Sequence, residues 1–362
     1  MTKDFRRILL FPLSIIYGFV IGVRNFLYNV GLLKSTTPDI PVIVIGNLAT
    51  GGTGKTPHSA YIIENLHTKF TTAFLSRGYR RKTKGFVLSR QGCKCEDIGD
   101  EPFQIHRNFP SITVAVDENR LRGIHTIRKL YPETQLIVLD DAFQHRKLKA
   151  GLNMLLTDFH CIYTRDQMLP TGNLRDSRKA ARRADIIVVT KCPPEITPIE
   201  MRLIELELKP QFHQQLYFSS YEYLKPVPLF RNEHSLEICF DWLKTNNAAV
   251  LLLTGIVSPG VIVKYLGKFS SKIIQARFPD HHEFGQYDLS RLEKQFNRIA
   301  NDKKIILTTE KDASRLINNK FLPNKLKNYI FVLPVKVKIL DNKQTILIQK
   351  ITDYVTENSG NR

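Results

Sequence analysis

The chain is short of cysteine, with five in 362 residues, and it contains no long low-complexity segment and no repeat of solenoid length. An odd number of cysteines at irregular spacing does not fit the disulfide framework of a small secreted protein. Cys93 and Cys95 form a CxC pair without a second pair, which is more typical of two loop thiols in a reduced cytosolic protein than of a metal site. The missing repeats and tracts exclude solenoid and low-complexity chains, so an ordinary globular protein is expected.

Acidic residues are also scarce, because 34 of them face 53 lysines and arginines and leave a net charge of +19. Such an excess favours anionic partners: nucleic acid, a phosphate-rich substrate or an anionic membrane surface. Charge alone does not choose among these. The hydrophobic content of 43% and the length fit one large α/β domain or two domains with cores of their own.

Charge is absent from Ile8 to Val23, an apolar run that Arg6-Arg7 and Arg24 flank. As a helix it would reach roughly 24 Å, which is shorter than the ~30 Å hydrocarbon core of a bilayer. No small-x-small cleavage motif follows, which disfavours a signal peptide. A buried core helix is the alternative. The flanking arginines favour a peripheral or monotopic helix, within residues 1–35, at the cytoplasmic face of a membrane.

From residue 36 to about 225, short apolar runs alternate with helical patterns, which is typical of an α/β fold. The runs lack polar alternation, so they predict a mostly parallel sheet buried on both faces by helices. The expected strands are 42–45, 72–75, 112–115, 136–139, 154–157 and 186–190, and the expected helices are 57–67, 101–108, 118–130 and 177–183.

A second, smaller α/β domain is expected over residues 226–362, after the proline-containing segment 223–228. Two extended runs, 329–339 and 344–351, are predicted to form a hairpin around Asp341-Asn342. The other expected strands are 249–254, 272–277 and 304–309, and the expected helices are 260–268, 287–300 and 311–317.

A glycine-rich segment directly after the first strand fits the phosphate-binding P-loop pattern GxxxxGK[ST], with alanine in its first position. Backbone N–H groups and the start of the next helix attract phosphate oxygens, Lys55 reaches the β- and γ-phosphates, and Thr56 offers a hydroxyl to Mg²⁺. The alternative is a tight turn without a ligand. The expected nucleotide-binding residues are Ala49, Thr50, Gly51, Gly52, Thr53, Gly54, Lys55 and Thr56.

The run 136–139 ends in Asp140-Asp141, an acidic pair at the carboxyl end of a predicted strand. Such a pair is often only a solvated turn, but beside a P-loop it predicts a Mg²⁺ ligand. Asp140 is the first choice for that ligand and Asp141 the second, so the metal-site prediction comprises Thr56, Asp140 and Asp141.

Three classes of nucleotide-binding protein compete. A GTPase is disfavoured because the segment after the strand 186–190 lacks the aspartate of an Asn-Lys-x-Asp loop. A P-loop ATPase acting on nucleic acid stays the alternative, although the basic clusters 80–84 and 178–183 lack interleaved aromatics. A kinase needs a base, and Asp100 together with His281 or His282 could supply one. Taken singly, these residues are more typical of a helix N-terminus and an exposed loop.

Seven ordered motifs closely resemble those of the tetraacyldisaccharide 4'-kinases, the lipid A 4'-kinases of Gram-negative bacteria. The likeness runs from the N-terminal apolar segment to about residue 315. The motifs are GNLATGGTGKTP (46–57), SRGYR (76–80), GDEP (99–102), LDDAFQHR (139–146), LPTGNLR (169–175), FPDHH (278–282) and TEKDA (309–313).

The resemblance implies transfer of the γ-phosphate of ATP, with Mg²⁺, to the 4'-hydroxyl of an acylated disaccharide 1-phosphate at the inner leaflet of the inner membrane. It implies that Asp100 and His281 act as the catalytic pair beside Lys55, with His281 chosen because it follows the aspartate of the FPDHH motif. A monomer on an anionic membrane surface is expected, with no nucleic-acid partner. The family continues its LPxGNLR motif with Glu-Pro where this chain has Asp176-Ser177. The expected substrate contacts are Arg77, Tyr79, Arg120, Gln144, His145 and Arg175.

Overall fold

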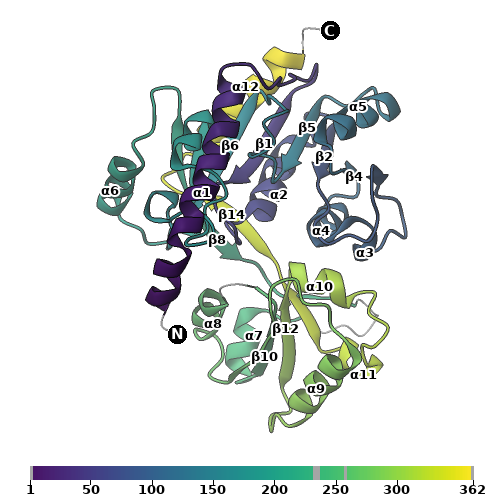
Figure 1. The fold of residues 1–362 in the computed structure, drawn as a ribbon. Helices are drawn as coiled ribbons and strands as arrows, with labels where there is room; N and C mark the ends of the chain where they lie inside the picture. The colour runs from purple at the N-terminus through teal and green to yellow at the C-terminus, as the bar shows by residue number, and fades with distance from the viewer. Residues whose placement is uncertain (1–2, 231–236, 257–258, 360–362) are drawn as a thin grey trace. The chain divides into compact units, whose positions relative to one another are not determined.

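The computed structural model describes residues 3–230, 237–256 and 259–359, which divide into two compact units (Figure 1). The first unit comprises Met1–Tyr221 and Val337–Arg362, and the second comprises Glu222–Lys336. The first division falls close to the expected residue 225. The assignment of all of 226–362 to the second domain is wrong, because the chain returns to the first unit at residue 337.

The first unit is built on a nine-stranded sheet with the order β14-β8-β7-β6-β1-β5-β2-β4-β3. Six neighbouring pairs, from β4 across to β8, are parallel, and β3 is antiparallel to β4. The expectation of a mostly parallel sheet is confirmed. The strands are β1 (Val42–Asn47), β2 (Thr72–Ser76), β3 (Val87–Leu88), β4 (Thr113–Val116), β5 (Leu136–Asp140), β6 (Leu152–Asp158), β7 (Ile186–Thr190), β8 (Gln215–Tyr223) and β14 (Val335–Ile339).

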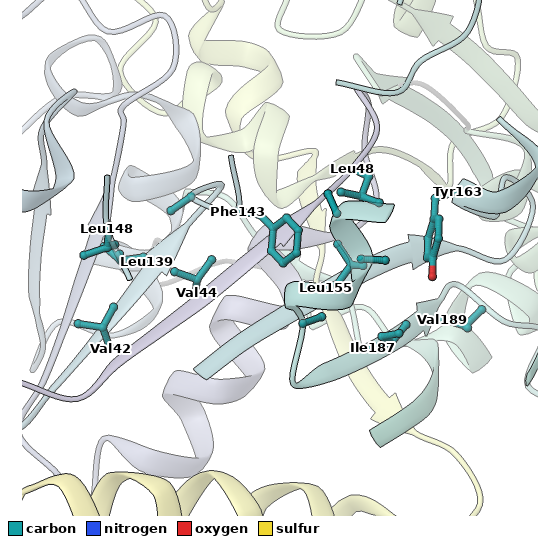
Figure 2. Packing of buried hydrophobic residues seen from close by; sticks show 14 of the residues in the cluster. Val42, Val44, Leu48, Leu139, Phe143, Leu148, Leu155, Tyr163, Ile187 and Val189 are labelled. Atoms are coloured by element: carbon teal, nitrogen blue, oxygen red, sulfur yellow. The ribbon is translucent and has the colours of Figure 1, made fainter. Parts of the chain in front are cut away.

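Hydrophobic clusters cover both faces of this sheet. Along β1, Val42 and Val44 belong to one cluster, which Figure 2 shows, while Ile43 and Ile45 belong to the other. Successive side chains of a strand point to opposite faces, so an unbroken apolar run fills both layers. The helices of this unit are α1 (Lys3–Asn29), α2 (Lys55–Leu66), α3 (Cys95–Ile98), α4 (Asp100–Asn108), α5 (Arg120–Leu130), α6 (Pro198–Leu208) and α12 (Gln344–Ser359), with 3₁₀ turns η1 (Tyr163–Arg165) and η2 (Arg178–Arg183).

The C-terminal segment corrects one sequence expectation. Residues 344–351 form part of helix α12 and not a strand, and Leu347, Ile351 and Val355 are buried at the four-residue spacing of a helix. Asp341 and Asn342, both with positive φ, therefore join a strand to a helix. Two further expectations need correction. The run 329–339 is interrupted at residue 334, and 177–183 forms 3₁₀ and not α-helical structure.

The second unit contains a five-stranded sheet with the order β11-β10-β12-β13-β9. Its strands are parallel except for β9, which pairs antiparallel with β13. The strands are β9 (Val227–Pro228), β10 (Ala249–Thr254), β11 (Ile273–Arg277), β12 (Lys304–Thr309) and β13 (Ile330–Leu333). The helices are α7 (Phe240–Thr245), α8 (Gly260–Leu266), α9 (Gln286–Asn297), α10 (Glu310–Leu316) and α11 (Asn324–Lys327).

Helix α1 places polar side chains against the first unit and leaves apolar ones exposed. The Ser14 hydroxyl lies 2.6 Å from that of Thr171, and the Tyr17 hydroxyl donates to the carbonyl of Arg175 at 3.0 Å. Asn25 donates to Asp176 at 2.7 Å. Of the helices that the structure describes, α1 alone contains a stretch, Leu9–Asn29, of the length and composition that could cross a membrane. That stretch is longer than the run from Ile8 to Val23 considered above.

Candidate active site

The P-loop connects the end of β1 at Asn47 to the start of α2 at Lys55. Gly54 has a φ of 87°, and a Cβ at this position would collide with the hydroxyl of Tyr221. Gly46 is restricted by contact, since a Cβ there would lie 2.6 Å from the Cβ of Phe143. Glycine is therefore required at both positions by conformation or close packing.

Neighbouring donors bind the carbonyl groups of this loop. Thr190 at the end of β7 donates its hydroxyl to the Thr53 carbonyl at 2.9 Å, and the Lys191 ammonium contacts the Gly52 carbonyl. Asn47 donates to the Thr53 hydroxyl at 2.8 Å. The bonds from Thr190 and Lys191 occupy loop carbonyls that would otherwise oppose an anion, and the N-terminus of α2 provides a positive electrostatic field.

His58, in the first turn of α2, is buried. Its Nδ1 lies 2.7 Å from the Gly54 carbonyl, and its Nε2 lies 2.9 Å from the hydroxyl of Ser219 on β8. Burial, with a smaller effect of Lys191, lowers the pKa of His58 to about 4. The imidazole is therefore neutral at pH 7 and joins the loop to the neighbouring strand β8.

Asp140 and Asp141 stand at the end of β5, directly beside β1 in the sheet. Among the described residues, neither carboxylate oxygen of the fully buried Asp140 has a hydrogen-bond partner. Burial and the nearby Glu101 and Asp141 raise the pKa of Asp140 well above its usual value. Asp141, in contrast, lies 3.7 Å from the Lys55 ammonium. A buried carboxylate without a donor is costly unless a cation neutralises it.

Arg120 lies beneath this acidic pair as one of the largest fully buried side chains. It donates to the backbone carbonyl of Asp117 at 2.8 Å and to that of Asp140 at 3.4 Å. Burial lowers the pKa of Arg120 to about 10, although the negative charges of Asp140 and Asp141 act to raise it. Its substrate-binding role stays a prediction, because the structure places it inside the protein.

Arg175 belongs to a segment that pairs with the P-loop. Its backbone N–H donates to the Leu48 carbonyl at 2.7 Å, and the Thr50 N–H donates to the Asn173 carbonyl at 2.7 Å. Its guanidinium makes two hydrogen bonds to Asp141, of 2.7 and 3.1 Å, and a third to the side-chain oxygen of Asn47. Arg175 therefore lies beside the P-loop and bonds to Asp141, an expected metal ligand.

Cations converge around His145. Burial, followed by the charges of Arg120, Arg24 and Arg77, lowers the pKa of His145 to about 4. Arg24 on α1 donates to the Gln144 carbonyl at 2.8 Å, and the Gln144 amide donates to the Asn47 carbonyl at 2.6 Å. Four of the six expected substrate residues, Arg77, Arg120, Gln144 and His145, thus share one positively charged neighbourhood. Tyr79 is exposed, with the Arg80 guanidinium over its ring.

Asp100 is the first residue of α4, where the helix dipole favours a carboxylate. The Cys95 thiol donates to its Oδ1 at 3.0 Å. The next residue, Glu101, acts electrostatically on Asp140. Within the described residues, no group of three His, Cys, Asp or Glu side chains could hold a metal ion, and this includes the region of Cys93 and Cys95.

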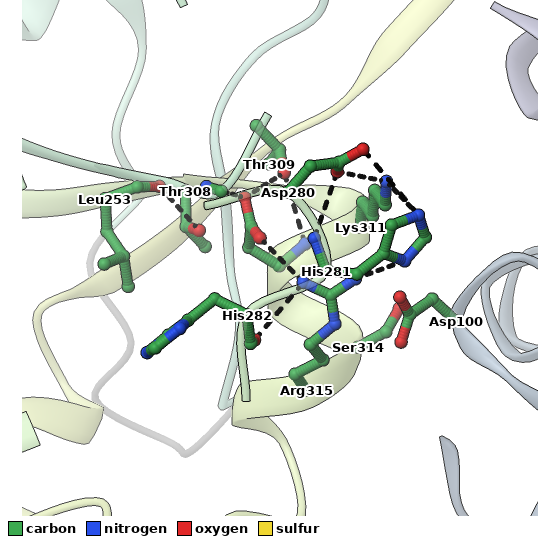
Figure 3. A network of polar contacts seen from close by, with 12 residues as sticks. Asp100, Leu253, Asp280, His281, His282, Thr308, Thr309, Lys311, Ser314 and Arg315 are labelled. Carbon is green, nitrogen blue, oxygen red and sulfur yellow. Dashed lines mark hydrogen bonds and ion pairs between the residues drawn. The ribbon is translucent and has the colours of Figure 1, made fainter. Parts of the chain in front are cut away.

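His281 lies in a charged cluster of the second unit, with a φ of 57° (Figure 3). Its Nε2 is 3.0 Å from the Lys311 ammonium and its Nδ1 is 3.1 Å from the Arg315 guanidinium. Lys311 also donates to Asp280 at 2.6 Å. His282 bonds instead to Asp288 at 2.8 Å and stacks on Phe278. The two histidines therefore have different surroundings, and both cations of the cluster contact His281.

A family model described as tetraacyldisaccharide-1-P 4'-kinase matches residues 6–354 of the chain. The chain belongs to the tetraacyldisaccharide-1-P 4'-kinase family. A curated tetraacyldisaccharide 4'-kinase of Bacteroides thetaiotaomicron is 44% identical over 97% of this chain and 94% of its own length. One from Flavobacterium johnsoniae is 42% identical over 97% of this chain and 98% of its own length.

A solved structure of a family member gives the same result for the fold. LpxK from Aquifex aeolicus, in complex with ATP, is 29% identical, covers 96% of this chain and 99% of its own, and has a TM-score of 0.73. The P-loop kinase fold expected from the sequence is confirmed, and nucleotide binding is a property of that relative.

Several residues of this site were not expected from the sequence. They are Asn47 and His58 at the P-loop, Thr190 and Lys191 after β7, and Arg24 on α1. In the sequence, Thr190 and Lys191 belong to a segment that lacks the aspartate of an Asn-Lys-x-Asp loop, which disfavours a GTPase and indicates no other role. Thr190, Lys191 and Arg24 reach the site through contacts with residues more than a hundred positions away, so no local pattern indicates them. Asn47 and His58 bond within the P-loop segment itself, to Thr53 and Gly54.

Proposed function

We propose that this protein transfers the γ-phosphate of ATP to the 4'-hydroxyl of tetraacyldisaccharide 1-phosphate, which forms lipid IVA in lipid A biosynthesis. The observation that carries the proposal is the buried, unpartnered Asp140 carboxylate beside the P-loop, with Asp141 held between Lys55 and Arg175. Family membership fixes the class of acceptor, because the curated relatives carry the name of this activity.

The donor atoms near the P-loop fit Mg²⁺. This hard cation prefers carboxylate and hydroxyl oxygens, and Asp140 offers two carboxylate oxygens without a hydrogen-bond donor in the part of the chain that the structure describes. Thr56 and Asp140, with Asp141 close by, would hold the ion. When bound together with ATP, the ion would neutralise charge on the β- and γ-phosphates.

The protein's own groups would bind and orient the reactants. Lys55 and the N–H groups at the start of α2 would stabilise the charge that develops on the transferred phosphoryl group. Asp100 would accept the proton of the 4'-hydroxyl, with His281 as its partner. Lys311 and Arg315 lie 3.0 and 3.1 Å from the two ring nitrogens of His281, and the nitrogen without a proton can accept a hydrogen bond from one of these cations.

The cations around His145 suit the acceptor's existing phosphate. Arg77 and Arg24 bring two guanidinium groups to this neighbourhood, and guanidinium binds phosphate through paired hydrogen bonds. Arg77 and Tyr79 are exposed and accessible to a sugar headgroup. Arg120, being buried, would act on an anion here mainly through its charge.

The side chains of α1 support a membrane-facing role, because its polar residues bond to the protein and many of its apolar residues are exposed. The polar side chains of Ser14, Tyr17 and Asn25 bond to the first unit, whereas Ile16, Phe19 and Val20 are among its many exposed apolar side chains. The bonds of these polar side chains support a helix that stays against the first unit and does not cross the bilayer. Its apolar face would lie in the interface of the inner membrane, on the cytoplasmic side.

The test is incubation of the protein with γ-labelled ATP and tetraacyldisaccharide 1-phosphate dispersed in detergent. Label is expected in the lipid, it should disappear in Lys55→Ala, and it should persist in Lys69→Ala, an exposed lysine after α2. Lipid labelling by the Lys55→Ala variant at the wild-type rate would falsify the P-loop assignment. The nucleic-acid alternative predicts ATP hydrolysis that DNA or RNA stimulates.

A further inference from the structure

Residues 171–176, called the bridging segment, contact the P-loop. The backbone N–H of Arg175 donates to the carbonyl of Leu48 at 2.7 Å. The guanidinium of Arg175 makes two hydrogen bonds to Asp141 and one to the side-chain oxygen of Asn47. The conformation of the bridging segment therefore decides where this guanidinium stands beside the P-loop.

Helix α1 bonds to the same segment from its polar face. The backbone N–H of Thr171 donates to the Ser14 hydroxyl at 3.0 Å, and the hydroxyls of these two residues lie 2.6 Å apart. Tyr17, three residues further along one face of the helix, donates its hydroxyl to the carbonyl of Arg175 at 3.0 Å. This bond fixes the backbone of the residue whose side chain holds Asp141.

Asp176 gives α1 a further, charged contact with the bridging segment. It is buried, and its Oδ1 accepts hydrogen bonds from the Asn25 amide at 2.7 Å and from the Ser177 N–H at 2.8 Å. Its Oδ2 accepts from the Arg183 guanidinium at 2.8 Å. The Ser177 donor exists because this chain has serine where the family's motif has proline, which lacks an N–H. A buried carboxylate with donors on both oxygens is costly to displace, so Asn25 holds the end of the segment.

A second connection runs from α1 to the start of the P-loop. Arg24 donates to the Gln144 carbonyl at 2.8 Å, and the Gln144 amide donates to the Asn47 carbonyl at 2.6 Å. Asn47 in turn donates to the Thr53 hydroxyl at 2.8 Å and accepts from Arg175. Both connections therefore meet at Asn47, the last residue of β1, where the P-loop begins.

We propose that Tyr17 and Asn25 are positioning residues for the ATP site. They hold the bridging segment so that the Arg175 guanidinium stays on Asp141, beside the P-loop. Simple adhesion of α1 to the protein would need no particular partner, but its bonds go to the two segments that themselves bond to the P-loop. The helix with the exposed apolar face is thereby part of the structure on which nucleotide affinity depends. This inference rests on the proposed function only in taking ATP as the ligand of the P-loop.

The first experiment measures nucleotide binding without the lipid acceptor, by calorimetric titration of the full-length protein in detergent with Mg²⁺ and β,γ-methylene ATP. Tyr17→Phe and Asn25→Ala should each raise Kd about three- to tenfold, the effect of one lost hydrogen bond. The controls Tyr28→Phe and Asn29→Ala lie on the same helix, where both residues contact Arg146, and should bind the analogue like wild type. Wild-type Kd values for Tyr17→Phe and Asn25→Ala overturn the proposal.

A double-mutant cycle separates positioning from a general loosening of the helix. Tyr17→Phe should change Kd by less than about twofold when Arg175 is already alanine, because the guanidinium through which the hydroxyl acts is gone. The same loss of about three- to tenfold in both backgrounds would overturn the positioning role. In steady-state kinetics, Tyr17→Phe should raise KM for ATP and leave KM for the lipid acceptor unchanged, a split that a loosened helix would not give.

Other outcomes separate this inference from the proposed function. A protein that binds the analogue and loses affinity in Tyr17→Phe and Asn25→Ala, but never labels the lipid, leaves the positioning role standing and refutes the proposed function. A protein that labels the lipid, with ATP affinity unchanged in both variants, does the reverse. Weaker partitioning of both variants onto phosphatidylglycerol vesicles, with ATP affinity unchanged, assigns Tyr17 and Asn25 to membrane docking of the helix and overturns the proposal.

Discussion

Arg175 makes a two-pronged ion pair with Asp141, and the same guanidinium bonds to Asn47 at the end of β1. Burial alone would raise the pKa of Asp141, but the charges of Lys55 and Arg175 outweigh it and lower that pKa to about 2. Arg175 thereby keeps an acid ionised beside the P-loop and joins it to the segment that pairs with the loop.

Arg175→Ala is expected to lower kcat/KM for ATP by roughly 10- to 100-fold, the effect of breaking a partly buried charge pair. Arg175→Lys should recover little, because an ammonium does not reproduce the two parallel hydrogen bonds. Steady-state kinetics with Arg182→Ala, an exposed arginine nearby, as control checks this. Full recovery by lysine would mean that charge alone matters at this position.

Asp140 and Asp141 should respond in opposite ways to the same substitution. A carboxyl group whose folded pKa is raised costs stability at pH values above its unfolded pKa, and the cost disappears as the pH falls. Asp140→Asn removes this cost, so the nucleotide-free protein should melt a few degrees higher at pH 7 while losing kinase activity. Asp141→Asn removes a stabilising pair and should melt lower. Scanning calorimetry of both variants, with and without Mg²⁺ and ATP, decides the matter.

His58 predicts a specific acid sensitivity. Its pKa is near 6.5 in the unfolded chain and about 4 in the folded protein. Between these values the unfolded state binds the proton and the folded state does not, so stability falls as the pH falls from 6.5 to 4. The full difference corresponds to about 3 kcal/mol.

His58→Gln keeps a group that can donate and accept hydrogen bonds but does not titrate, so it should flatten this decline. Urea unfolding at pH 7 and pH 4.5, with His125→Gln at an exposed histidine as control, measures the effect. An equally steep decline in wild type and His58→Gln would assign the acid sensitivity to other groups. The Lys191 charge adds to the shift, so its removal should raise the pKa of His58 slightly.

The sequence predicted the parts of this protein that depend on neighbouring residues. The P-loop and the strand before Asp140-Asp141 have local signatures, because glycine at positive φ and apolar strands leave a pattern in a few residues. Strands such as Ile186–Thr190 and Ala249–Thr254 were placed to the residue.

Two kinds of feature were not predicted from the sequence. The apolar residues of 344–351 predict a strand, but Leu347, Ile351 and Val355 lie four residues apart and are buried on one face of helix α12. The return of the chain to the first unit, the bond of His58 to Ser219 and the bond of Thr190 to the P-loop join residues far apart in the chain. The pairing of Asp100 with His281 stays a prediction from the family resemblance.

A double-mutant cycle tests that pairing. Asp100→Asn should lower kcat by more than about 100-fold with little change in ATP affinity, because a general base acts only on the acceptor's proton. If His281 acts through Asp100, His281→Gln should cost much less in the Asp100→Asn background than in wild type. Additive losses would show that the two residues act independently. His282→Gln is the matched control, since His282 bonds to Asp288 and not to the Lys311–Arg315 pair of cations. A loss confined to His281→Gln, and absent once Asp100 is gone, would assign the base to a carboxylate that this imidazole orients.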